Sequence, residues 1–221
     1  MFKARISKEE VNRLPVALFE GTITLVEKAS EVEAAVNDLF CYKLAGVDTE
    51  TRPSFSRGTY HRVSLLQIST ENKCYLFRLN KTGLHPALIN FLASDKVKKI
   101  GLALRDDFTG LSRLQPFKPE NFVDLQTIAG RYGILELGLQ KVFAILFNKK
   151  ISKAQRLTNW ESDDLTEQQQ RYAATDAWAC LLIYNQLISS KKITQKEFKK
   201  LVEDDANARA ESLEARKNEV I

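Results

Sequence analysis

The chain contains few of the residues that build disulfide-rich or zinc-stapled folds. Only three of its 221 residues are cysteine, and only two are histidine. Cys41, Cys74 and Cys180 lack the spacing of a zinc site, and an odd, sparse count argues against a disulfide framework. We therefore expect reduced thiols and a cytoplasmic location.

Long apolar runs and phosphate-cradling glycine loops are also absent. No run of about 18 apolar residues occurs, so no membrane-spanning helix is expected. The first residues, MFKARISKEEVNRL, lack the apolar stretch of a signal peptide. The pattern G-x-x-x-x-G-K-[ST] does not occur among the nine glycines, which argues against a nucleotide-binding regulator.

The chain does have enough apolar residues for a proper core, together with a small excess of positive charge. It is 44% hydrophobic and 28% charged, as is typical of globular domains. The net charge of +5 favours a polyanionic partner only weakly, because mildly basic proteins without such a partner are common.

Sequence patterns predict one α/β domain. Three strands in a row indicate an antiparallel meander, and the turn-like ENK separates the last two: LAGVDTET, HRVSLLQIST and KCYLFRL. Helices and strands then alternate, which predicts a mixed sheet with helices on both faces. Thr166 and Gln169 have the spacing of a capping box, so a long helix should begin near Glu167. We expect a lead-in over residues 1–21, the domain over 22–190 and a charged helical tail over 191–221.

Two acids follow the apolar start of the first meander strand. Asp48 and Glu50 are two residues apart, so a strand places them on one face. A buried carboxylate without a partner costs several kcal/mol, and no lysine or arginine has the matching spacing. The alternative is a solvated strand end.

Two further segments carry acids that periodicity turns inward. Asp107 shares a helical face with Leu111 and Leu114, although both Asp106 and Asp107 suit a helix N-terminus. Tyr172 and Asp176 are four residues apart, on one face of the helix expected after Thr166. Aspartate is a poor residue for a helix interior, so an exposed Asp176 is the competing interpretation.

Acids from three separate segments therefore converge if the inward interpretation holds. Such carboxylates repel one another and stay protonated unless cations hold them. Mg²⁺ or Mn²⁺ fits best, because both ions prefer oxygen ligands. Four carboxylates can hold two such ions, a pair that activates water and stabilises a leaving oxygen in phosphodiester hydrolysis.

These segments resemble the three motifs of the DEDD superfamily of 3′–5′ exonucleases. The matching stretches are VDTET, IGLALRDDFTGL and RYAATDAWA. Arg171 stands where the histidine branch would have its histidine, so the chain resembles the tyrosine branch, DEDDy. Over roughly residues 22–190 it is most similar to the Werner syndrome exonuclease domain and, less so, to RNase D. The resemblance implies a ribonuclease H-like fold.

The resemblance also implies a role for each residue of the motifs. Asp48 would contact both metal ions, Glu50 and Asp176 would complete the site of the ion that carries the attacking water, and Asp107 would bind the second ion largely through water. Tyr172 would orient the water, because its ordinary pKa of about 10 makes it a poor base at neutral pH. Nucleoside 5′-monophosphates would leave from the 3′ end.

Two basic segments are candidates for nucleic-acid contacts. RPSFSRGTYHR, with Arg52 and Arg57, follows the first motif and mixes arginines with aromatics, which suits phosphate binding and base stacking. NKKISKAQR, with Lys149, Lys150, Lys153 and Arg156, precedes the helix of the third motif. An exposed hairpin loop and a solvated basic segment are the alternatives.

The substrate expected from the resemblance is single-stranded or 3′-recessed nucleic acid, with DNA favoured over RNA. An RNase D-like exoribonuclease is the first alternative, since nothing in the sequence reads a 2′-hydroxyl. The second is an adaptor that binds nucleic acid without hydrolysis. Such an adaptor would be expected to lack a metal ligand, and all four acids are present.

Overall fold

The centre of the protein is a six-stranded mixed sheet. The computed structural model describes residues 2–56, 58 and 60–218. The strand order is β2-β5-β4-β3-β6-β7. In chain order the strands are β2 (Thr22–Val26), β3 (Leu44–Thr51), β4 (Val63–Ser69), β5 (Lys73–Arg78), β6 (Lys98–Gly101) and β7 (Phe122–Asp124). Strands β3, β4 and β5 form the predicted antiparallel meander, while β6 and β7 continue the sheet parallel to β3.

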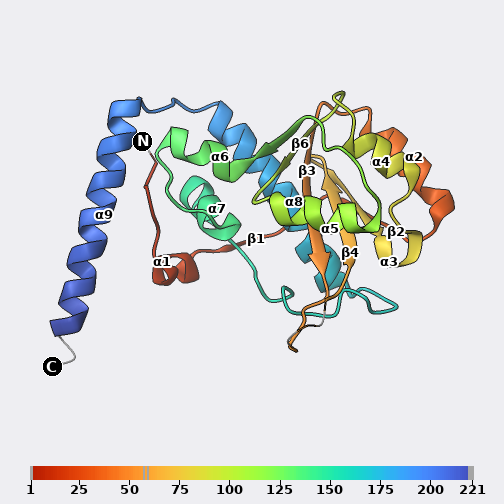
Figure 1. The fold of residues 1–221 in the computed structure, drawn as a ribbon, viewed down its shortest axis with the longest axis horizontal. Coiled ribbons are helices and arrows are strands. Elements are labelled where there is room, and N and C mark those ends of the chain that lie inside the picture. Colours follow the sequence, from red (N-terminus) through yellow and green to blue (C-terminus); the bar gives the residue numbers. More distant parts are fainter. Residues whose placement is uncertain (1, 57, 59, 219–221) are drawn as a thin grey trace.

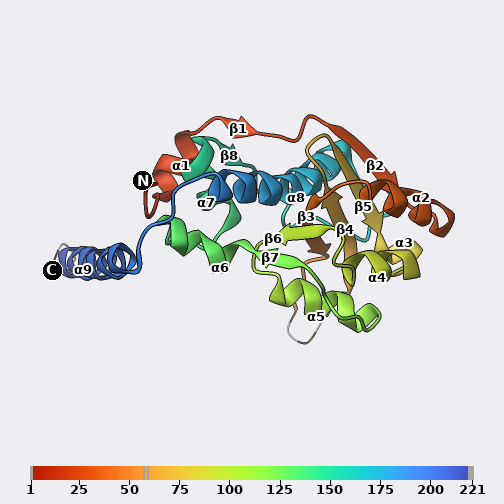
Figure 2. The same cartoon turned by 90° about the horizontal axis from the view of Figure 1, so that it is seen from above.

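Helices cover both faces of the sheet, as the sequence predicted (Figure 2). One face packs against α2 (Ala29–Leu39), α3 (Leu79–Thr82), α4 (Pro86–Leu92) and α5 (Arg105–Leu114). The other face packs against α6 (Leu125–Ala129), the short 3₁₀ helix Gly130–Tyr132, α7 (Leu139–Phe147) and α8 (Glu167–Ile188). Apolar side chains on both sides of the sheet form the core.

Helix α8 begins at the predicted capping box and runs directly across β3. The Thr166 side chain accepts a hydrogen bond from the Gln169 backbone, and the Gln169 side chain accepts one from the Thr166 backbone. Gly46 allows the close approach, because a Cβ at that position would overlap the Ala177 carbonyl oxygen. The glycine at position 46 therefore allows α8 to lie this near to β3.

The first residues of the chain form a strap along α7 and α8. After α1 (Lys8–Arg13), the two-residue strand β1 (Val16–Ala17) pairs in parallel with β8 (Lys150–Ile151). The Phe19 backbone amide then donates to the Thr175 hydroxyl on α8 at 3.0 Å. The sequence did not predict this pairing, since two-residue strands carry no periodic pattern.

The last helix, α9 (Gln195–Asn218), projects away from the body of the domain (Figure 1). Its first turns touch the domain through Phe198 at Gly130, and Asp205 pairs with Arg5 at 2.6 Å. None of the helices in the described ranges has the length and apolarity to span a bilayer. Cys41, Cys74 and Cys180 are all free thiols.

Candidate active site

The site begins at the carboxyl end of β3, in the middle of the sheet. Asp48 and Glu50 alternate with Thr49 along the strand, so both acids face α8. β4 pairs alongside them in antiparallel register, with Gln67 opposite Asp48. The two carboxylates are therefore fixed by the central meander and are partly buried.

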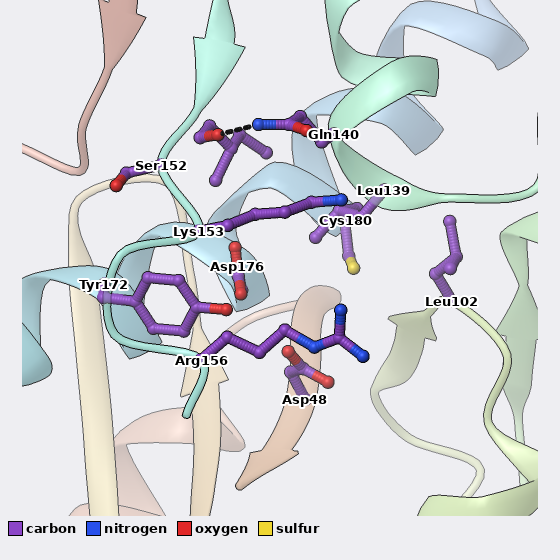
Figure 3. A pocket seen from close by; sticks show the side chains of 11 residues that line it. Asp48, Leu102, Leu139, Gln140, Ser152, Lys153, Arg156, Tyr172, Asp176 and Cys180 are labelled. Atoms are coloured by element: carbon purple, nitrogen blue, oxygen red, sulfur yellow. Dashed lines mark hydrogen bonds between the residues drawn. The ribbon is translucent and has the colours of Figure 1, made fainter. Parts of the chain in front are cut away.

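Helix α8 brings the third acid to the same place. Asp176 is buried, with 8% of its surface exposed, and lies one turn after Tyr172. Ligand atoms from Asp48, Glu50 and Asp176 all lie within 4.8 Å of one another. Figure 3 shows Asp48 and Asp176 facing the same cavity, with the Tyr172 hydroxyl directed toward them.

Burial, together with repulsion at Asp48 and Glu50, makes these acids harder to ionise. Removal from water, with added repulsion from neighbouring carboxylates, raises the pKa of Asp48 well above its ordinary value. Burial, followed by the charges of Asp176 and Asp107, raises the pKa of Glu50 to about 9. Burial raises the pKa of Asp176 to about 7. Ionising all three acids therefore requires compensating positive charge.

Asp107 lies beside this cluster but outside it. It is in the first turn of α5, and its carboxylate accepts a hydrogen bond from the Thr49 hydroxyl on β3. Burial raises the pKa of Asp107 in spite of that bond. The structure thus groups three of the four predicted acids and holds the fourth at their edge, close enough for its charge to act on Asp48 and Glu50.

The start of α5 is fixed by an acid from the next strand. Asp124 accepts hydrogen bonds from the backbone amides of Ala103 and Leu104 at 2.9 and 3.0 Å, and from Gln126 at 2.9 Å. It therefore caps α6 and also ties the turn before α5 to β7. This second role fixes the start of α5 and, with it, the position of Asp107 in the first turn.

The predicted basic residues divide into two groups. Lys153 and Arg156 line the acidic cavity, which has a volume of about 410 Å³, and their cationic ends extend over the carboxylates (Figure 3). Their charges lower the pKa of Asp176 and Glu50 respectively, opposing the effect of burial. Lys150 instead donates to the Asn12 carbonyl at 2.6 Å, and Lys149 lines a separate hollow beside β1.

The loop after β3 is tied to the segment that precedes α8. Arg52 forms an ion pair with Glu161 at 3.3 Å, and His61 contacts the same carboxylate at 3.4 Å. These contacts pin the loop to the segment before α8. Arg57 lies outside the described residues.

Tyr172 combines an apolar ring with a hydroxyl at the acids. Its ring packs against the fully buried Trp160, with ring centroids 6.0 Å apart. Burial and the charges of Asp176, Glu50 and Asp48 raise the pKa of Tyr172 far above its ordinary value. The hydroxyl therefore keeps its proton at neutral pH and can orient a water molecule.

The donor set suits hard divalent cations. Three carboxylates offer oxygen ligands at mutual distances that one ion can bridge, and the group is acid-only. Asp107 adds a fourth carboxylate beside Asp48, whose pKa responds to its charge. The residues present therefore fit Mg²⁺ or Mn²⁺ better than a metal that prefers sulfur or imidazole.

Comparison with known proteins assigns the family. The sequence profile described as 3′-5′ exonuclease matches residues 23–191. This chain belongs to the 3′–5′ exonuclease family. The mouse (Mus musculus) protein described as "Bifunctional 3'-5' exonuclease/ATP-dependent helicase WRN" is 32% identical over 196 residues, covering 84% of this chain. The match spans only 14% of that mouse protein, so its other activities are not transferred here.

Solved structures share the fold. The Aedes aegypti Nibbler EXO domain superposes with a TM-score of 0.70 at 24% identity, covering 79% of this chain and 91% of that one. Escherichia coli RNase D superposes with a TM-score of 0.68 at 20% identity, covering 76% and 44%. These likenesses confirm the ribonuclease H-like architecture expected from the resemblance, and the profile match confirms the expected exonuclease family.

Two contributors to the site were not predicted. Thr49 holds the Asp107 carboxylate, and Asp124 anchors the turn that precedes α5. Alternation along β3 turns Thr49 away from Asp48, so only the position of α5 could reveal its partner. For Asp124 the helix-cap signal was readable, but the bonds to a turn 20 residues earlier were not.

Proposed function

We propose that this protein is a two-metal 3′–5′ exonuclease that removes nucleotides from the 3′ end of DNA. The observation that carries the proposal is the group of three carboxylates within 4.8 Å, two from β3 and one from α8. Water would attack the phosphorus of the last phosphodiester, and the O3′ atom of the preceding nucleotide would leave. Each cycle would release a nucleoside 5′-monophosphate.

The acids are assigned to the two cation positions that this family resemblance implies. Asp48, Glu50 and Asp176 would hold one ion, and Asp48 and Asp107 would hold the other. Mg²⁺ or Mn²⁺ supplies, when bound, neutralisation of the carboxylates and acidification of the attacking water. Thr49 would keep the Asp107 carboxylate in place through its hydroxyl.

The remaining roles belong to side chains that line the cavity. Tyr172 would position the attacking water, because its raised pKa keeps the hydroxyl protonated. Lys153 and Arg156 face the carboxylates across the cavity and would bind the anionic phosphate of the substrate. Without substrate, the same two cations partly offset the charge of the acids.

DNA is proposed as the substrate because of the similarity to the Werner syndrome exonuclease domain. Single-stranded or 3′-recessed ends would fit a site that takes one terminal nucleotide at a time. RNA is the second candidate, and its support is a specific one: the similar E. coli RNase D is described as an exoribonuclease. None of the residues assigned here selects the sugar by itself.

Digestion of end-labelled strands tests the proposal. Matched DNA and RNA strands, labelled at either the 3′ or the 5′ end, are incubated with Mg²⁺, Mn²⁺ or chelator. We expect a 3′ label to be released at once as a labelled mononucleotide and a 5′-labelled strand to shorten stepwise. Chelator should stop digestion of both strands. Release of the 5′ label first, or digestion in chelator, would contradict the proposal. Faster digestion of RNA than of DNA would show that RNA is the substrate.

A further inference from the structure

A second cleft opens beside Asp107, on the face of the sheet opposite α8. It has a volume of about 610 Å³ and lies between the end of β3, the start of β4 and helix α5. Arg62 and Arg113 line it, together with the Tyr60 and Thr109 side chains. The acidic cavity described above is lined by different residues, including Asp48, while Thr49 and Thr51 of the same strand line this cleft.

The two arginines of this cleft have no acidic partner among the described residues. Both are exposed, and neither takes part in an ion pair within the described part of the chain. Arg52, which lies with Arg62 in the segment between β3 and β4, is by contrast already paired with Glu161. Arg62 and Arg113 are therefore available to an external anion.

Packing of α5 on β4 brings the two arginines into one cleft. Asp106, Gly110 and Arg113 follow one another at helical spacing, so they share a face of α5. A Cβ at Gly110 would press against the Val63 side chain at the start of β4. The missing side chain lets α5 approach the strand where Arg62 precedes Val63.

The charge along the cleft changes from acidic to basic. Asp106 and Asp107 lie at the first turn of α5, whereas Arg113 lies at its last turn. Arg113 lies six positions after Asp107, which corresponds to about 9 Å along the helix axis. An anion at Arg113 would therefore lie apart from a phosphate held at the acids.

We propose that this cleft binds the phosphates of the nucleic-acid strand upstream of the 3′-terminal nucleotide. Arg62 and Arg113 hold the backbone from opposite walls, while Lys153 and Arg156 face the scissile phosphate in the acidic cavity. The inference rests on the proposed function, and it adds the direction in which the strand leaves the site. Exposed Tyr60, at the rim, gives an upstream base a ring to stack on.

Strand length separates this cleft from the catalytic cavity experimentally. The double variant Arg62→Gln/Arg113→Gln is compared with the matched control Arg105→Gln/Lys118→Gln, which removes two exposed charges in and after the same helix but outside the cleft. Binding of a 5′-fluorescent 12-nucleotide strand is measured by anisotropy in chelator over a salt series. Hydrolysis of that strand and of a dinucleotide is measured with Mg²⁺.

We expect the cleft variant to bind the 12-nucleotide strand about tenfold more weakly and to lower the salt slope by about 1.4. Its kcat/KM for the dinucleotide should stay within twofold of the parent, and the control should resemble the parent throughout. Equal losses in both double variants, equal losses on both substrates, or no loss on the long strand would each overturn the inference. If the parent hydrolyses neither substrate, the proposed function fails, and the anisotropy series alone still decides the cleft.

Discussion

Helices α8 and α9 are similar in length, 22 and 24 residues, but their surroundings differ completely. α8 buries 13 side chains under the sheet and carries Tyr172 and Asp176, while α9 extends from the domain and is largely exposed (Figure 1). An acid on α9, such as Asp205, has a lowered pKa because Arg5 bonds to it. Asp176 on α8 has a raised pKa because it is buried.

The comparison shows what burial does to an acidic side chain. On the exposed helix an aspartate is ionised at little cost and contributes at most a surface ion pair. On the buried helix the same group must be protonated or held by a cation. The proposed chemistry therefore depends on buried, closely spaced carboxylates, which destabilise the folded state when no cation holds them.

The largest expected effect comes from removing the buried charge on α8. Asp176→Asn should lower exonuclease turnover by about 10³-fold or more, because a ligand of the proposed cation site is lost. The matched change on the exposed helix, Asp205→Asn, should leave turnover within twofold. Single-turnover digestion of a labelled strand measures both, and similar rates for the two variants would contradict the distinction between the helices.

Tyr172→Phe, one turn earlier on α8, should have a smaller effect. We expect a loss of about 10- to 100-fold in kcat, since only water orientation is removed. Mn²⁺ affinity, measured by calorimetric titration, should change little because the carboxylates remain. An unchanged kcat would remove the proposed role, and a parallel loss of Mn²⁺ affinity would show that the variant disturbs the acids themselves.

Gly46→Ala tests whether α8 must lie so close to β3. The added methyl overlaps the Ala177 carbonyl, so we expect a loss of about 1–3 kcal/mol in the free energy of unfolding. Gly138→Ala is the control, because a Cβ there meets nothing within 4 Å. Urea denaturation compares the two variants, and equal stabilities would mean that the backbone contact is not tight.

Removing the outer part of α9 should have the smallest effect. Deletion of residues 208–221 keeps the Arg5–Asp205 pair and leaves the contacts of Phe198 in place. Turnover should stay within twofold, and the melting temperature should shift by no more than about 2 °C. A large loss of activity would give the exposed helix a role that its contacts with the domain do not suggest.

Sequence patterns predicted those parts of the fold in which local signals agree. Three successive apolar strands predicted the meander, and the Thr166–Gln169 box marked the start of α8. Four-residue spacing on that helix placed Tyr172 and Asp176 together on a side facing the sheet. These features depend on neighbours in sequence, so they could be read without knowing the rest of the molecule.

The parts that were not predicted depend on partners far apart in sequence. β1 and β8 pair over two residues each, too few for any periodicity. The direction of a flexible basic side chain depends on its surroundings, which is why Lys150 turns to the Asn12 carbonyl while Lys153 faces the acids. Likewise, Asp107 bonds to Thr49 because α5 lies on the face of β3 to which Thr49 points.

The free energy of unfolding measured against pH, in chelator and in Mg²⁺, tests the central claim most directly. Burial raises the pKa of Asp176 to about 7 and that of Glu50 to about 9, so the folded state holds protons that the unfolded chain releases near pH 4. In chelator, stability should therefore fall by several kcal/mol between pH 5 and 9, since about 1.4 kcal/mol corresponds to each pKa unit. Mg²⁺ should remove most of that fall, and Asp176→Asn should make the chelator curve flatter. A chelator curve that is flat or rises over this range, or one that Mg²⁺ leaves unchanged, would contradict the claim that divalent cations hold these buried acids together.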